Sequence, residues 1–352
     1  MLPLTSPPEN ICIVRLSALG DVTHAVPVVR AIQKHWPQAR ITWICAKLEH
    51  KLLSALDGID FVVVDKNSGW GGYYRLWRKM AGQRFDIMLQ MQTSARANAN
   101  GAMVRADIKL GWDRLRARDF HRLFMTDTIP QTRFEHQVQG HLSFARSMGL
   151  DVSEPEWNFP VSDDAIAFVN SVVPVEQKIL LISPCSSHVH RNWRAERYAA
   201  VADHAIAQHG MTVVLSGGPS PLERSLGEAI EAASKNSLIN LIGKDTLPQL
   251  VALLKRADIV LSPDSGPVHL ANALGTPVIG LHACTWSRRS GPYNSLDLCV
   301  DKFAEAARRY RNSTPEQLRW GTRIEEAGVM DLVEVNEVID RLELALSSWP
   351  EK

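Results

Sequence analysis

The sequence lacks the features that assign many proteins to a class at first sight. Its five cysteines are scattered and include no CxxC pair. This fits neither a disulfide framework nor a zinc ribbon, and it predicts reduced, mostly buried thiols of a cytosolic protein. The opening residues MLPLTSPPEN have neither the basic start nor the apolar core of a signal peptide. No apolar run reaches the roughly 18 residues of a membrane-spanning helix. We therefore expect a cytoplasmic protein that meets a membrane only from the side.

Signatures of several ligand classes are also missing. No predicted strand is followed by GxGxxG, and there is no GxxxxGK[ST] loop, so the sequence gives little support to a nicotinamide or flavin enzyme. The aspartates form no DxD pair and the histidines no HExxH motif, so we predict no metal site and no cofactor. The net charge of +1 argues against wholesale nucleic-acid binding.

Length and apolar pattern together predict two domains. The chain has 352 residues, whereas single cores stop growing at about 250–300. We place the boundary at the end of the stretch SEPEWNFP, which gives domains 1–160 and 161–352. In each, short apolar runs alternate with segments of helical periodicity, as in parallel sheets covered by helices on both faces. The predicted fold class is α/β, with two Rossmann-like doubly wound domains facing a central cleft.

The expected elements follow from these runs. In the first half the strands are 11–16, 41–46, 61–64 and 85–90, with a helix at 22–36. In the second half the strands are 179–184, 212–218, 238–242, 259–262 and 277–281, with helices at 195–209, 247–255 and 268–274. The tail from Thr314 is helical in pattern and ends with a helix at 332–346.

Asp21 follows the first strand, where a helix is expected to begin. An aspartate in that position is commonly an N-cap, worth about 1 kcal/mol to its helix. The other role is a carboxylate at the rim of the cleft that acts as a general base. The roles compete, because a carboxylate that holds backbone N–H groups has a lowered pKa and is a poorer base. Position alone leaves both open.

Two loops of the second half carry groups suited to a diphosphate. In PDSGPVH, at 263–269, the N–H groups around Ser265 and Gly266 are expected at a helix N-terminus, where anions bind. The loop 183–193 brings hydroxyls and Arg191 to another strand end, and a guanidinium binds phosphate in a fork. An ordinary turn capped by Asp264 and a polar surface loop are the structural alternatives.

The segment 96–122 carries seven basic residues against three acidic ones. A solvated face and an anion-receiving surface explain the excess equally well. The basic residues are Arg96, Arg105, Lys109, Arg114, Arg116, Arg118 and Arg122. A second basic run, RRYR at 308–311, suits plain surface or a membrane-facing edge.

Three stretches together resemble glycosyltransferase family 9, the bacterial lipopolysaccharide heptosyltransferases. They are IVRLSALGDVTHAVPVVRAI, SSHVHRNW and SPDSGPVHLANALGTPVIGLH, and the likeness extends over nearly the whole chain. With Ser68-Gly69-Trp70 and LQMQTSARAN, the chain is most similar to the heptosyltransferase I branch that acts on Kdo. The resemblance implies a GT-B fold and an inverting, metal-independent transfer. The implied donor is ADP-L-glycero-D-manno-heptose, and the implied acceptor is Kdo-lipid A at the cytoplasmic face of the inner membrane.

The same resemblance implies roles for particular residues. Asp21 falls on the family's glycine-aspartate motif, where the aspartate is the proposed catalytic base. Arg191 stands where a diphosphate-contacting lysine is frequent, and this exchange changes reach and geometry. Glu223 matches an acidic residue near the ribose. The remaining donor-binding residues are Ser186 and Ser187, where threonines are usual, and Asp264, Ser265, Gly266 and His269. The basic residues of 96–122 would receive the acceptor.

Three alternatives stay open. In the first, the chain is a heptosyltransferase II or another family member with a different acceptor or donor. In the second, it is a sugar-nucleotide epimerase of GT-B architecture, which releases free sugar and nucleotide without an acceptor. In the third, it is a non-catalytic nucleotide-binding partner in envelope assembly, and the Asp21 motif argues against this alternative.

Overall fold

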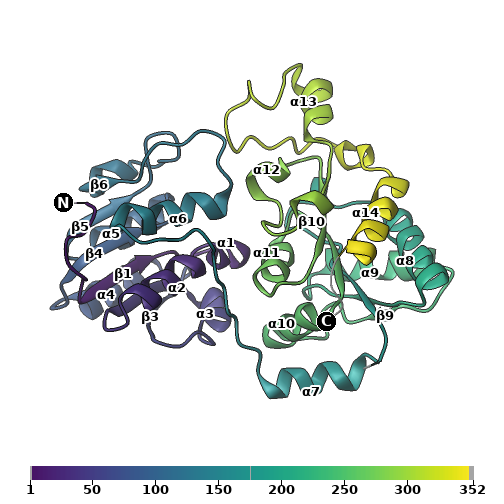
Figure 1. Ribbon diagram of the computed structural model, residues 1–352, viewed down its shortest axis with the longest axis horizontal. Helices are drawn as coiled ribbons and strands as arrows, with labels where there is room; N and C mark the ends of the chain where they lie inside the picture. The colour runs from purple at the N-terminus through teal and green to yellow at the C-terminus, as the bar shows by residue number, and fades with distance from the viewer. Residues whose placement is uncertain (1, 175, 349–352) are drawn as a thin grey trace. The chain divides into compact units, whose positions relative to one another are not determined.

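The computed structural model describes residues 2–174 and 176–348. The chain divides into two compact units, Met1–Pro160 and Val161–Lys352, called unit 1 and unit 2 below (Figure 1). Each unit is built on its own six-stranded parallel sheet with helices around it. Among the described residues, every helix is too short or too polar to span a bilayer.

Unit 1 alternates strands and helices along the chain. Its strands are β1 (Asn10–Val14), β2 (Arg40–Ala46), β3 (Ile59–Val64), β4 (Phe85–Gln90), β5 (Ala106–Gly111) and β6 (Asp127–Thr128). Its helices are α1 (Leu19–Thr23), α2 (Val26–His35), α3 (Lys47–Leu53), α4 (Gly69–Met80), α5 (Ala95–Ala102) and α6 (Gln137–Met148), with a 3-10 turn η1 (His121–Phe124).

Unit 2 repeats the plan after α7 (Asp163–Val172). Its strands are β7 (Ile179–Ile182), β8 (Thr212–Leu215), β9 (Ile239–Asn240), β10 (Ile259–Pro263), β11 (Val278–His282) and β12 (Val300–Asp301). Its further helices are α8 (Ala195–His209), α9 (Pro221–Ala233), α10 (Leu247–Arg256), α11 (Gly266–Ala273), α12 (Ser287–Ser290), α13 (Phe303–Arg311) and α14 (Val335–Ser348). Short 3-10 turns are η2 (Val189–Arg191), η3 (Leu296–Leu298) and η4 (Val329–Leu332).

Both sheets reverse their strand order beside their first strand. The orders are β3-β2-β1-β4-β5-β6 and β12-β11-β10-β7-β8-β9. The reversal therefore lies between β1 and β4 in unit 1 and between β7 and β10 in unit 2. Doubly wound sheets bind ligands at the carboxyl ends of the strands at this point. The fold therefore predicts ligand-binding groups in the loops after these four strands.

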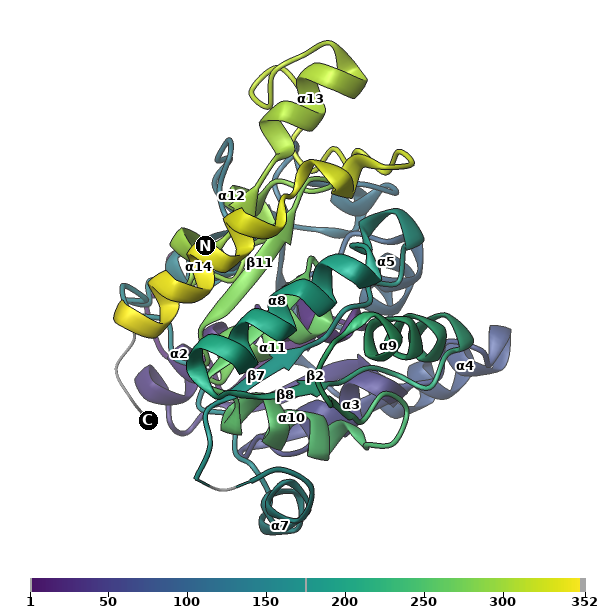
Figure 2. The same ribbon diagram turned by 90° about the vertical axis from the view of Figure 1, so that its right-hand side faces the viewer.

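Apolar packing holds the helices of unit 2 to its sheet. Inward side chains of β7, β8, β10 and β11 form one cluster with α8, α9 and α14, and Figure 2 shows α8 and α14 side by side. Trp193 and Tyr198 are almost fully buried in this cluster, with ring centroids 5.1 Å apart. These two rings anchor the loop after β7 to the start of α8.

The predicted helix at 22–36 is wrong in one respect: two helices, α1 and α2, occupy this region, and α1 begins at Leu19. Pro27 lies in the first turn of α2 and has no N–H with which to continue a preceding helix. The Thr23 carbonyl instead accepts the indole N–H of Trp157, at 3.1 Å. The break thus ties the end of α1 to the last segment of unit 1.

The tail also differs from the prediction. Residues 314–328 form turns and irregular backbone, and the helical part is α14. The sequence pattern gave no bounds for β5, β6 and β12, nor for the helices α3 to α7, α9, α12 and α13. The expected strand at 238–242 is only the two residues of β9. Strands of two residues leave no periodic signal, because they span only one period of the alternation that marks a strand.

Candidate functional site

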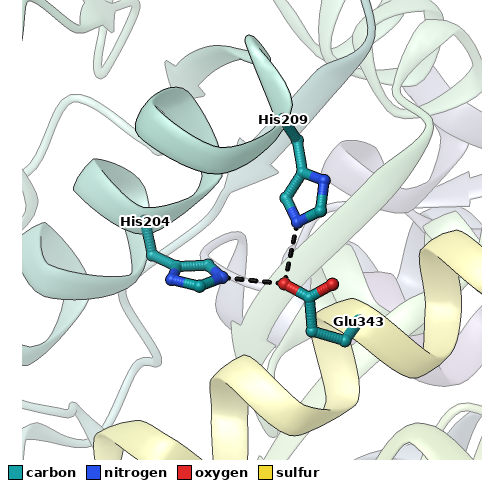
Figure 3. Close-up of side chains that lie close together, drawn as sticks. All are labelled: His204, His209 and Glu343. Atoms are coloured by element: carbon teal, nitrogen blue, oxygen red, sulfur yellow. Dashed lines mark hydrogen bonds and ion pairs between the residues drawn. The ribbon is translucent and has the colours of Figure 1, made fainter.

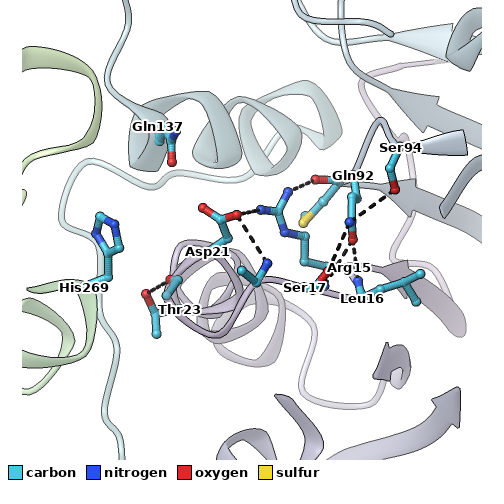
Figure 4. A network of polar contacts seen from close by, with 12 residues as sticks. Arg15, Leu16, Ser17, Asp21, Thr23, Gln92, Ser94, Gln137 and His269 are labelled. Carbon is cyan, nitrogen blue, oxygen red and sulfur yellow. Dashed lines mark hydrogen bonds and ion pairs between the residues drawn. The ribbon is translucent and has the colours of Figure 1, made fainter. Parts of the chain in front are cut away.

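Asp21 lies just beyond the carboxyl end of β1, inside the first turn of α1 (Figure 4). The N-cap of α1 is Ala18, so the N-cap role considered for Asp21 is wrong. One carboxylate oxygen accepts the Ala18 N–H at 3.3 Å and pairs with Arg15 Nη2 at 2.9 Å. The Asp21 side chain is 37% exposed, whereas that of Arg15 is 10% exposed. Asp21 therefore presents a carboxylate to solvent from a braced position.

Arg15 and Gln92 hold the side chain of Asp21 and the backbone before it in place. Neither role was predicted from the sequence. Arg15 Nη1 donates to the Met91 carbonyl at 2.6 Å, beyond the end of β4. Gln92 Oε1 accepts the N–H groups of Leu16 and Ser17, at 2.8 and 3.2 Å. These contacts join the ends of β1 and β4 across the switch point (Figure 4). A charged residue closing the apolar run of β1 was the available signal for Arg15.

Behind this pair, α6 contributes a buried histidine. Burial, reinforced by the positive charge of Arg15, lowers the pKa of His141 to about 3. Its ring lies against Trp112, with centroids 5.1 Å apart. His141 is thus neutral at physiological pH, and Arg15 is a cation in direct contact with Asp21.

The structure divides the seven basic residues predicted to receive the acceptor. Arg105 directly precedes β5, and Lys109 lines the same hollow beside residues 82–84, which lead into β4. That is the amino edge of the sheet, opposite to Asp21. Arg116 pairs with Asp113 and with Glu135, and it lies over the Trp112 ring at 4.9 Å. Arg105 and Lys109 therefore lie away from Asp21, whereas Arg116 and Asp21 both lie close enough to His141 to act on its pKa.

The other four basic residues belong to one exposed region at the carboxyl edge. They are Arg96, Arg114, Arg118 and Arg122. Asp119 accepts the Ala95 N–H at 2.9 Å, which ties their loop to the start of α5. His121 bonds to Asn98 of α5 at 2.8 Å. We call Arg96, Arg114, Arg118 and Arg122 the basic loop.

In unit 2, Arg191 lies in the loop after β7 and is only 10% exposed. Its Nε donates to Glu325 Oε1 at 2.9 Å, and its Nη1 lies 4.0 Å from Asp264. Ser186 is buried, and its N–H donates to Asn192 at 2.7 Å, whereas Ser187 is exposed. A diphosphate held here must share Arg191 with two carboxylates.

The loop after β10 brings the other predicted donor residues to the same edge. Ser265 is the N-cap of α11, so a cap at Asp264 is wrong. Asp264 lies 3.8 Å from His269 Nε2. Burial alone would raise the pKa of Asp264, but the neighbouring side chains of His282, His269, Thr285 and Arg191 together lower it. Asp264 is therefore an anion that faces Arg191 and His269 at the start of α11.

Glu223 has a local structural role in the loop after β8. Its carboxylate accepts the Gly218 N–H at 2.7 Å and the Ser220 hydroxyl at 2.5 Å, which closes the first turn of α9. Because β8 pairs with β7, this loop neighbours the one that holds Arg191. Glu223 thus shapes the same carboxyl edge.

Glu325 and His282 were missed in unit 2. Glu325 pairs with a residue 134 positions away, so sequence spacing carries no trace of the contact. His282 ends β11 and is fully buried; a histidine closing a strand was the available signal. A third group, His204, His209 and Glu343, converges outside this edge without any of the metal motifs sought in the sequence.

Comparison with known proteins identifies the family. A model described as glycosyltransferase family 9 (heptosyltransferase) matches residues 73–320. The chain is 38% identical over 342 residues to the lipopolysaccharide core heptosyltransferase OpsX of Haemophilus influenzae, with 97% of this chain and 98% of that protein covered. The chain belongs to glycosyltransferase family 9. It is therefore a glycosyltransferase, and the predicted recognition is confirmed.

Solved structures of family 9 share the fold. The family 9 glycosyl transferase from Veillonella parvula DSM 2008 superposes with a TM-score of 0.79 at 20% identity, covering 96% of this chain and 97% of its own. E. coli heptosyltransferase WaaC, solved with ADP, superposes at 0.72 and 18% identity, covering 96% and 99%. The GT-B fold class is thereby confirmed.

Proposed function

We propose that this family 9 enzyme transfers L-glycero-D-manno-heptose from ADP-heptose to Kdo of Kdo-lipid A, with inversion of configuration. The observation that carries the proposal is the exposed Asp21 carboxylate, braced by Arg15 at the switch point of unit 1. The relative OpsX, a lipopolysaccharide core heptosyltransferase that matches 97% of this chain, supports an acceptor in the lipopolysaccharide core.

In this proposal unit 2 binds the donor through its diphosphate. Arg191 supplies a fixed positive charge, and the N–H groups of Ser265 and Gly266 lie at the N-terminus of α11, where a negative charge is stabilised. Ser186 and Ser187 lie in the same loop as Arg191, after β7. As the glycosidic bond breaks, ADP gains charge, and these groups offset it without a divalent ion.

Unit 1 binds the acceptor and activates it. The basic loop attracts the carboxylate and phosphate groups of Kdo-lipid A. Asp21 accepts the proton of the acceptor hydroxyl while that oxygen attacks the anomeric carbon from the side opposite ADP. The transition state has oxocarbenium character, and the new bond forms with inverted configuration. No cofactor takes part in this scheme.

The test is ADP release from ADP-heptose with and without Kdo-lipid A. We expect acceptor-dependent release that falls about 100-fold or more in Asp21→Ala, because a general base typically contributes that much. ADP binding, measured by calorimetry, should be unchanged in the variant. Asp107→Ala is the matched control, since that carboxylate pairs with Arg84 away from the site.

Other outcomes separate the alternatives. Release only on an already heptosylated acceptor would make the chain a heptosyltransferase II. Release of free sugar and nucleotide without acceptor would make it an epimerase. Near-normal turnover by Asp21→Ala would remove the assignment of this residue as the base.

We also propose that unit 1 touches the cytoplasmic face of the inner membrane through α4. Trp70, Tyr74 and Trp77 are 89%, 58% and 51% exposed and share one side of the helix, whereas Leu76 and Met80 on the other side are buried. Exposed basic residues accompany the aromatics: Arg75, Arg78 and Lys79. Aromatic rings beside cations suit the headgroup region of an anionic bilayer.

Co-sedimentation with vesicles measures this contact. We expect binding to phosphatidylglycerol-containing vesicles but not to phosphatidylcholine alone, because charge and ring insertion act together. Trp70→Ser/Trp77→Ser should weaken binding about tenfold through lost apolar burial. Arg308→Ser/Arg309→Ser on α13 is the control for a basic surface without exposed indoles. Equal losses in both double variants would argue against an α4 contact.

A further inference from the structure

The end of α8 and the last helix, α14, bring three metal-ligating side chains together (Figure 3). His204 Nε2 and His209 Nε2 each lie 2.7 Å from Glu343 Oε1. The ligand atoms of all three residues lie within 4.8 Å of one another. The histidine side chains are 25% and 27% exposed and the glutamate 46%. An ion from solvent can therefore reach the cluster.

The residue types fit a borderline divalent transition metal. Two imidazoles and one carboxylate form a set that Zn²⁺ accepts, with water completing a tetrahedron. Ligand atoms about 2.0–2.1 Å from the ion stand about 3.3 Å apart, whereas the three ligand atoms here lie between 2.7 Å and at most 4.8 Å apart. Binding therefore requires the three partly exposed side chains to rotate, with Glu343 Oε1 moving outward from both histidines. Hard cations such as Mg²⁺ prefer oxygen ligands and fit poorly.

We propose that His204, His209 and Glu343 form a zinc-binding site that fastens α14 to α8. The site is separate from sugar transfer. α8 begins after the loop that holds Arg191, at the carboxyl end of β7, and ends before Thr212 at the amino end of β8. His209 is the last residue of α8, so the cluster lies at the edge of unit 2 opposite Arg191.

The position suits a structural link. Near the start of α8, Trp193 Nε1 donates to the Val333 carbonyl at 3.0 Å, and Arg194 pairs with Asp331. The chain before α14 is thus already fixed to the end of the loop that holds Arg191. α14 then runs alongside α8, with Val338, Leu342 and Ala345 buried. A metal at Glu343 would hold the far end of the same helix pair.

The test uses full-length, tag-free, chelator-treated protein titrated with ZnCl₂ by calorimetry, together with thermal unfolding. We expect one equivalent of Zn²⁺ to bind and to raise the melting temperature, because an ion that binds only the folded state stabilises it. Mg²⁺ should do neither. Co²⁺ in place of Zn²⁺ should give visible absorption bands of tetrahedral coordination. All five cysteines are buried, so they compete poorly for the added ion.

Glu343→Gln and His209→Asn should each weaken Zn²⁺ binding at least tenfold and abolish the rise in melting temperature. ADP release from ADP-heptose should be the same in both variants without metal. His35→Asn on α2 is the control for an exposed histidine elsewhere. The proposal fails if the wild-type protein binds no Zn²⁺ at about 100 µM, where a site of useful affinity would be filled. It also fails if the two variants bind Zn²⁺ as the wild type does.

Discussion

At the residue scale, the central feature is a buried arginine that supports an exposed aspartate. Arg15 contacts Asp21 with one terminal nitrogen and the Met91 carbonyl with the other. The guanidinium therefore fixes the carboxylate relative to the end of β4. A rigid fork of this kind orients an acid more sharply than a lysine ammonium does.

Replacing Arg15 tests whether it positions the proposed base. We expect Arg15→Gln to lower the turnover number about tenfold or more, because the carboxylate loses its orientation. The affinity for ADP should stay unchanged, since that nucleotide is assigned to unit 2. Arg15→Lys should recover part of the turnover through its single positive charge. An equal loss in both variants, accompanied by a lower melting temperature, would mean that Arg15 acts only on stability.

At the element scale, the loops after β7 and β10 form one charged network. Glu325 accepts from Arg191 at 2.9 Å and lies 3.6 Å from His188 Nε2. Asp264 faces Arg191 from the other loop. The carboxylates orient the guanidinium but also offset the positive charge available to a diphosphate. The network thus lowers the affinity of Arg191 for an anion but holds its guanidinium in one orientation.

Removing one of these charges should reveal that balance. We expect Glu325→Gln to bind ADP about fivefold more tightly, because an ion pair of this exposure is worth about 1 kcal/mol, and glutamine still accepts a hydrogen bond from Arg191. Arg191→Ala should weaken ADP binding tenfold or more. Calorimetric titration with ADP measures whether the affinity rises or falls in each variant. Weaker binding by Glu325→Gln would show that orientation outweighs charge.

At the scale of the molecule, the stability of unit 1 should depend on two neutral histidines. His121 Nε2 accepts the Trp112 N–H at 2.9 Å, which leaves Nδ1–H to donate to Asn98. Burial lowers the pKa of His121 to about 4 and, with the charge of Arg15, that of His141 to about 3. The unfolded chain takes up these protons near pH 6.5. The contribution of these neutral histidines to the free energy of unfolding is therefore complete above pH 6.5 and is lost as pH falls toward their folded pKa values.

Urea unfolding at pH 7 and pH 5 measures the effect. Because the unfolded chain binds a proton at each histidine, the unfolding free energy of unit 1 should be lower at pH 5 than at pH 7 by on the order of 2 kcal/mol per histidine. His141→Leu should remove about half of the loss, because one of the two titrating groups is gone. His35→Asn, on the exposed side of α2, should leave the loss as it is. The same pH dependence in His141→Leu and the wild type would assign the effect to other groups.

Much of the fold was predictable because buried parallel strands are apolar throughout. β1 (NICIV), β2 (RITWICA), β7 (ILLI) and β10 (IVLSP) stand out as short, mostly apolar runs. β5, with the sequence ADIKLG, alternates polar residues and escaped detection. The break between α1 and α2 escaped it as well, because helical periodicity continues past Pro27 although the hydrogen bonding does not.

The sequence by itself determined the α/β class, the family and the placement of Asp21, Arg191 and Asp264 after strand ends, since short motifs and local periodicity carry that information. Only the tertiary structure decided which groups meet. It paired Arg15 with Asp21, joined Glu325 to Arg191 and separated Arg105 from the basic loop. It also gathered His204, His209 and Glu343 at one end of a helix pair. The physical reason is that these contacts arise from strand order and helix docking, which bring together residues far apart in the chain.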